Sequence, residues 1–115
     1  MTSIAEDLVA KFRAAAEFME KLPMQLLTQK PSAHFAENYN SARAVALSKY
    51  PDIGGVAPPE IAIVQDPSGA IPKATFIEII SYSTELANIL KPRADAERLR
   101  RATENIQRLN SPRRW

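Results

Sequence analysis

The sequence has no cysteine and a single histidine, His34. The absence of cysteine excludes a disulfide framework, a thiolate zinc site and a cysteine nucleophile. A single histidine cannot form a multi-histidine metal site. No serine nucleophile motif accompanies it, so we interpret His34 as a surface residue in the first turn of a helix rather than as a catalytic base. The sequence therefore predicts a protein that is not an enzyme and that binds no metal and no cofactor.

Long apolar runs and phosphate-binding loops are also missing. The longest uninterrupted apolar runs have four residues, as at Ile61 to Val64, so no membrane-spanning helix is expected. The N-terminal residues show no basic stretch followed by an apolar one, so we expect no signal peptide and a cytoplasmic protein. The three glycines, Gly54, Gly55 and Gly69, match no phosphate-binding pattern and are explained by turns.

The rest of the composition is that of an ordinary globular domain. The chain has 115 residues, of which 45% are apolar and 24% are charged. This length accommodates one domain with one hydrophobic core. We therefore expect residues 1–115 to form a single helical domain that ends in a short basic tail, residues 111–115.

Apolar residues recur at steps of three and four along most of the chain, which is the spacing of one helix face. Two capping boxes, Ser3–Glu6 and Thr75–Glu78, mark helix starts. Pro92 interrupts the last helical pattern, either as the first residue of a new helix or as a kink in one long helix. Residues 24–29 suffice for one short extra turn. The predicted fold is mainly α, an irregular four-helix bundle with helices near 3–22, 32–50, 75–91 and 93–110.

The segment between the second and third predicted helices, residues 51–74, is extended and rich in proline and glycine. It is too apolar for a free linker, so we expect it to cross the helices with its isoleucines in the core. Asp66 to Gly69 matches a type I turn. Two interpretations stay open: a hairpin in which residues 61–65 pair with residues 70–71 or beyond, and a loop that ends where Thr75 caps the next helix.

The C-terminal segment is basic, whereas the rest of the chain is mildly acidic. Residues 91–115 contain eight basic and three acidic side chains, and residues 1–90 contain seven basic and ten acidic ones. This asymmetry is a hint about partners. The candidate residues for contact with a protein or a nucleic acid are Arg93, Arg98, Leu99, Arg100, Arg101, Ile106, Arg108, Arg113, Arg114 and Trp115. The competing interpretation is a solvated helix face whose arginines pair with Glu97 and Glu104.

An apolar seam of a/d spacing runs along the same segment, formed by Leu99, Ala102, Ile106 and Leu109. The seam packs either on the third predicted helix or on its counterpart in a second chain. It is shorter than the three heptads that would predict a coiled coil by themselves. Residues 54–60 form a second candidate contact surface.

Our first hypothesis is a non-enzymatic protein–protein interaction module, such as an adaptor, an inhibitor or an assembly subunit. It would bind another protein or self-associate as a homodimer, using the arginine-rich C-terminal helix. The alternative hypothesis is a nucleic-acid-binding protein that contacts phosphates through these arginines, with Trp115 stacked on a base. No membrane partner is expected.

Overall fold

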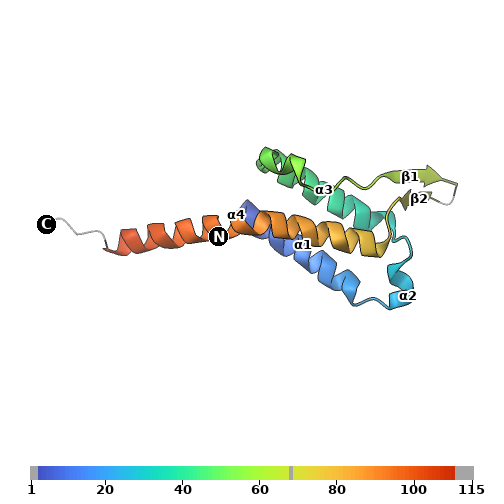
Figure 1. The fold of residues 1–115 in the computed structure, drawn as a ribbon, viewed down its shortest axis with the longest axis horizontal. Helices are drawn as coiled ribbons and strands as arrows, with labels where there is room; N and C mark the ends of the chain where they lie inside the picture. The colour runs from blue at the N-terminus through green and yellow to red at the C-terminus, as the bar shows by residue number, and fades with distance from the viewer. Residues whose placement is uncertain (1–2, 68, 111–115) are drawn as a thin grey trace.

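The chain folds around one long helix. The computed structural model describes residues 3–67 and 69–110, and over these residues the elements follow one another along the chain as α1 (Ile4–Glu20), α2 (Met24–Leu27), α3 (Ala33–Lys49), the 3-10 helix η1 (Pro51–Gly55), β1 (Ile63–Asp66), β2 (Gly69–Pro72) and α4 (Phe76–Asn110). The mainly helical fold class is confirmed, as is a small β element between the second and third predicted helices. Figure 1 shows α1 and α3 lying along α4, with the β-hairpin at one end and the end of α4 at the other.

The helix starts follow the predicted capping boxes. The Ser3 hydroxyl accepts a hydrogen bond from the Glu6 amide at 3.1 Å. The Thr75 hydroxyl likewise accepts from the Glu78 amide at 3.3 Å, and the Glu78 carboxylate accepts in return from the Thr75 amide at 3.2 Å. These bonds satisfy amide groups that have no partner within the helix, which is why α1 and α4 begin where the sequence predicts.

The predicted division of the C-terminal helix at Pro92 is wrong, because α4 continues through Pro92 as one helix of 35 residues. Proline lacks the amide that would bond to the carbonyl of Asn88. Both residues are exposed to solvent, so water can satisfy that carbonyl. The chain still has four α-helices in its described part, but the additional one is the short α2 and not a separate helix at 93–110.

Contacts on both sides of Pro92 keep α4 continuous. Lys91 pairs with Asp95 across the proline, at 3.6 Å between Nζ and the carboxylate. Arg93 forms an ion pair with Asp52 in η1. Leu90 and Ala94 are buried on either side of Pro92, and this packing offsets the cost of a proline inside the helix.

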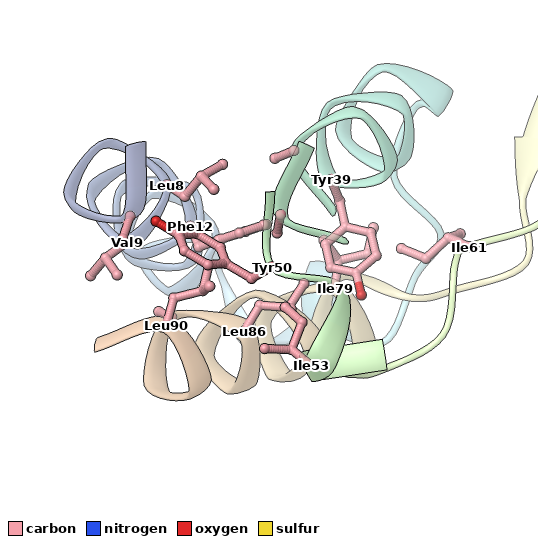
Figure 2. Close-up of a cluster of buried hydrophobic side chains, with 14 of the residues drawn as sticks. Leu8, Val9, Phe12, Tyr39, Tyr50, Ile53, Ile61, Ile79, Leu86 and Leu90 are labelled. Carbon is pink, nitrogen blue, oxygen red and sulfur yellow. The ribbon is translucent and has the colours of Figure 1, made fainter. Parts of the chain in front are cut away.

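The core is formed where α1 and α3 meet α4. The fully buried large side chains include Phe12 and Met19 of α1 and Ile79, Leu86 and Leu90 of α4. Figure 2 shows side chains from α1, α3, η1 and α4 converging on this core. Because α1 is amphipathic and lies along α4, its burial, worth about 25 cal/mol per Å² of apolar surface, holds the two helices together.

Side chains of α3 hold the extended segment before β1. The Asn40 amide donates to the carbonyl of Ile61 at 2.8 Å and accepts from the Ile61 amide at 2.9 Å. The Tyr39 hydroxyl donates to the carbonyl of Pro59 at 3.0 Å, and Arg43 Nε donates to the carbonyl of Pro58 at 2.8 Å. Three polar side chains within about one turn of α3 therefore supply the hydrogen bonds that a neighbouring strand would otherwise give to this segment.

The expectation that the isoleucines of the segment enter the core is met in part. Ile53 and Ile61 are 3% and 4% exposed, whereas Ile63 and Ile71, which lie on the two strands, are half-buried. The hairpin interpretation is correct, with β1 and β2 antiparallel and Val64 opposite Ile71. Gly69 starts β2 with φ of 126°, a conformation that favours glycine.

Asn40→Ala should lower the free energy of unfolding by about 1–3 kcal/mol, because it leaves both polar groups of the Ile61 backbone without their partner. Asn38→Ala is the matched control on the same helix, since Asn38 is exposed and its side chain bonds the neighbouring His34 on the surface of α3. Urea denaturation followed by circular dichroism measures both variants. Equal stability of the two variants would contradict the importance of this pair of bonds.

Candidate protein-interaction surfaces

A long apolar groove lies between α1 and α3. It encloses about 890 Å³. Its walls are α1 and α3, and its floor includes Ile79 and Ser83 of α4. The groove therefore opens on the side of the molecule that faces away from α4, and we call it the α1–α3 groove.

The α1–α3 groove exposes large apolar side chains at both of its ends. Ile4 and Val45 lie at one end and are 43% and 50% exposed. Phe18 lies near the other end, is 59% exposed and stacks on Phe35 with ring centroids 6.1 Å apart. Phe35 in turn meets the edge of Phe76 at 5.4 Å. Exposed large apolar side chains that line a groove between two helices are typical of a binding site.

The polar residues around the α1–α3 groove give it little net charge. Asp7 and Lys11 line it from α1 and carry opposite charges. His34, Asn38 and Ser41 line it from α3, and Asn38 lies 3.2 Å from the His34 ring nitrogen. This observation agrees with the interpretation of His34 as a surface residue. The groove is suited to an apolar ligand and not to a highly charged one.

This groove was not predicted from the sequence, although α1 carries its signal. The apolar residues at steps of three and four along α1 form a stripe that runs from Ile4 through Leu8, Phe12 and Ala15 to Met19, but Ile4 and Ala15 are exposed and line the groove. The residues that α1 buries include Ala5, Val9 and Ala16, which lie outside that stripe. The apolar arc of α1 is thus wider than one core contact requires, and this width was the available sign of a second apolar surface.

Three of the candidate arginines form ion pairs within the chain. Arg93 pairs with Asp52 and also lies over the Tyr50 ring, with its guanidinium carbon 5.1 Å from the ring centroid. Arg98 pairs with Asp95 at 2.9 Å. Arg101 pairs with Glu6 of α1. These contacts indicate that Arg93, Arg98 and Arg101 form ion pairs within the chain and are not freely available as phosphate ligands.

The structure gives less information on the other candidate residues. Arg100 is exposed on α4. Arg108 lies near the end of α4. Arg113, Arg114 and Trp115 lie outside the described residues. Within the segment 54–60, Gly54 to Val56 are exposed, whereas Pro58 is buried against α3.

Three of the four residues of the seam on the C-terminal part of α4 face away from the core, and the side chain of the fourth, Leu109, lies outside the described ones. Leu99 and Ile106 are 68% and 57% exposed, and Ala102 is exposed as well. Leu99 follows the buried Leu90 by nine residues, which is about 2.5 turns and therefore half a turn around the helix. Packing of this seam on the third predicted helix is thus wrong for Leu99, Ala102 and Ile106. We call these three residues the outer stripe.

A polar contact fixes the helix just before the outer stripe. The Tyr50 hydroxyl at the end of α3 donates to Glu97 Oε1 at 2.9 Å. The hydrogen bond that Ser3 donates is the main cause that lowers the pKa of Glu97 below its ordinary value of 4.5; burial opposes it, and the bond from Tyr50 adds to it. Burial, followed by the bond to Glu97, raises the pKa of Tyr50. Glu97 therefore joins the start of α1 and the end of α3 to α4.

Beyond this contact α4 extends past the rest of the molecule. The chain measures 74 Å along its longest axis and 29 and 22 Å along the others. Figure 1 shows the last turns of α4 running past the start of α1 without another element beside them. The outer stripe thus lies on a helix that is free to meet another chain on that side.

No family model matches the chain, and no curated protein or solved structure was found to match it either. Among residues 3–67 and 69–110, no group of three or more aspartate, glutamate or histidine side chains is arranged to hold a metal ion. In the same part of the chain, no helix combines the length and the apolar character needed to cross a membrane.

Glu97→Gln should make the stability of the protein less sensitive to acid. Because the folded pKa of Glu97 lies below its ordinary value of 4.5, the ionised group stabilises the fold above that pH, and this contribution is lost as the pH falls through the folded pKa. The free energy of unfolding, measured by urea titration between about pH 6 and pH 3, should fall less steeply in the variant. Glu104→Gln, an exposed change further along α4, should keep the wild-type slope; an identical slope in all three proteins would refute this role of Glu97.

Proposed function

We propose that this chain is a non-enzymatic protein–protein interaction module and that the α1–α3 groove receives an amphipathic helix from a partner protein. The observation that carries the proposal is the groove itself, which presents Ile4, Phe18 and Val45 to solvent between two helices. A helix that lays its apolar face into such a groove is a common mode of recognition. The docked helix would pack against α1 and α3 as a further helix of the bundle.

The dimensions of the α1–α3 groove support a helical ligand. Its α1 wall runs from Ile4 to Phe18, which is about 21 Å of helix, or four turns. A partner helix of about 14 residues would match that length, with apolar residues at positions i, i+4, i+7 and i+11 on one face. Since Asp7 and Lys11 are the fully charged side chains that line the groove, the apolar face and not charge would supply most of the affinity.

The C-terminal part of α4 does not compete for its own groove. The groove is floored by α4 and opens away from it, and α4 is one continuous helix to Asn110. A straight helix cannot turn back across α1 and α3 to reach that side. The ligand that we propose is therefore a segment of another protein.

Nucleic acid is the weaker candidate. The pairing of Arg93, Arg98 and Arg101 with acidic residues of the same chain reduces the positive charge available for phosphates. A nucleic-acid complex would lose affinity steeply with salt, by about 0.9 log unit per log unit of salt for each phosphate neutralised on duplex DNA. Binding in the apolar groove should depend only slightly on salt.

The direct test is site-specific photocrosslinking in the cells that naturally produce the chain. Ala15→p-benzoylphenylalanine places the reactive group in the α1–α3 groove, and the same change at Ala10 places it on an exposed part of α1 outside the groove. We expect a crosslinked protein from position 15 and not from position 10, joined to a segment of helical amphipathic sequence. Equal crosslinking from both positions, or a crosslink to an extended or strongly charged segment, would refute the proposal.

Phe18→Glu should weaken binding of the crosslinked partner by at least about tenfold, because it places a charge on the apolar wall of the groove. The fold should survive, since the Phe18 side chain is more than half exposed, at 59%. Met24→Glu is the matched control, an exposed apolar side chain outside the groove. Calorimetry with the purified partner at low and high salt measures all three proteins, and undiminished binding by Phe18→Glu would exclude the groove as the site.

A further inference from the structure

The outer stripe on α4 is a second apolar surface, and it is independent of the α1–α3 groove. Leu99 and Ile106 are among the most exposed large apolar side chains of the described residues. They lie on the side of α4 opposite to the core, whereas the groove opens on the core side of that helix. Among residues 3–67 and 69–110 no element covers the outer stripe, because the other elements lie on the opposite face of α4.

We propose that the outer stripe is the self-association surface of the chain, on which two copies pair antiparallel through α4. The spacing of Leu99, Ala102 and Ile106 is that of successive a, d and a positions of a heptad. In a pair of such seams, the side chains of each helix insert between the side chains of the other. The seam is therefore complementary to itself. A two-fold axis across the stripe makes the contact isologous, so that association ends at the dimer.

The charge pattern around the outer stripe favours a second copy. The positions that flank the stripe at its centre are Thr103 and Asn105, which are uncharged. Arg100, Arg101 and Glu104 lie further around the helix. When two outer stripes pair, these residues remain in solvent or beside α1 of their own chain. Two identical stripes can therefore meet without opposing charges of the same sign at the flanking positions.

The position of Asp95 selects the antiparallel orientation. Asp95 precedes Leu99 by four residues, which places it at the d position of the preceding heptad. In a parallel pair Asp95 would face Asp95 of the other copy, and like charges directly opposite are unfavourable. In the antiparallel register that faces Ala102 with Ile106 of the second copy, the two-fold axis is level with residue 104. The two Thr103 residues then lie close together on either side of the axis, and the two Asp95 residues lie far apart.

The antiparallel arrangement also leaves room for α1 and α3 of both copies. The core faces of the two α4 helices point in opposite directions, so α1 and α3 of one copy lie away from those of the other. In α4 the outward positions before Asp95 include Asn88 and Pro92, which are exposed and not large apolar side chains. The apolar contact is therefore restricted to the projecting end of α4, and it should form a weak dimer because it spans fewer than three heptads.

Sedimentation equilibrium of the purified chain from about 10 μM to about 1 mM tests the proposal, a range that covers weak association. We expect a reversible monomer–dimer equilibrium. Ile106→Glu should weaken the dimer at least about tenfold, because it brings a charge into the apolar contact. Ile77→Glu is the matched control, an isoleucine of the same helix that is 47% exposed at the other end of α4, against 57% for Ile106; it should leave the dimer intact.

Three results would overturn the proposal. The first is a chain that stays monomeric over the whole concentration range, and the second is a dimer that Ile106→Glu leaves unchanged. The third is a series of species larger than the dimer that disappears with Phe18→Glu, because it would mean that the end of α4 enters the groove of the next copy. Such a head-to-tail contact does not close.

Orientation is tested separately by cysteine crosslinking, which is simple because the chain has no cysteine of its own. Thr103→Cys should crosslink efficiently with a short bifunctional maleimide in an antiparallel dimer, since the two positions lie close together on either side of the axis. Leu99→Cys should crosslink poorly, because its counterpart is at the far end of the contact. The reverse result would establish a parallel dimer and refute the antiparallel arrangement.

Discussion

The structure depends on α4 remaining one helix through Pro92. α1 and α3 both pack on α4 and diverge from each other, so neither forms a closed pair without it. The contacts of Arg93 with Asp52 and of Tyr50 with Glu97 lie just after the proline and connect α4 to η1 and α3. If α4 ended at Pro92, the following residues would be free to pack as a separate helix. Its continuity keeps the α1–α3 groove open and carries the outer stripe away from the core.

The second constraint is the way in which α3 replaces a β-strand. The chain between η1 and β1 has backbone groups that a two-stranded hairpin cannot satisfy, and Tyr39, Asn40 and Arg43 supply partners from one face of α3. Burial of Tyr39, the main cause, raises the pKa of its hydroxyl to about 12, so this donor stays protonated at ordinary pH.

Local signals in the sequence predicted the elements well, and long-range contacts decided the rest. The capping boxes at Ser3 and Thr75 and the turn that ends at Gly69 act within a few residues, and the structure has a helix start or a hairpin at each of them. Pro92 misled the prediction because its local effect is opposed by the packing of Leu90 and Ala94 in a core whose other residues are distant in sequence. The pairing of Arg101 with Glu6 has the same origin, since the two residues are 95 positions apart. The groove could not be derived because periodicity shows how wide an apolar face is, but not whether a neighbour covers it.

The two proposed contacts fit together because they use opposite faces of one helix. The α1–α3 groove opens on the core side of α4, and the outer stripe lies on the reverse side. Pairing through the outer stripe would therefore leave both grooves accessible and directed to opposite sides of the dimer. Such a dimer could not place both grooves on one flat surface, but it could bring two partner molecules together. A partner that is itself an oligomer would then be bound more tightly than either groove alone allows, because the second contact forms at a high effective concentration. This geometry favours an adaptor or an assembly subunit over a simple inhibitor.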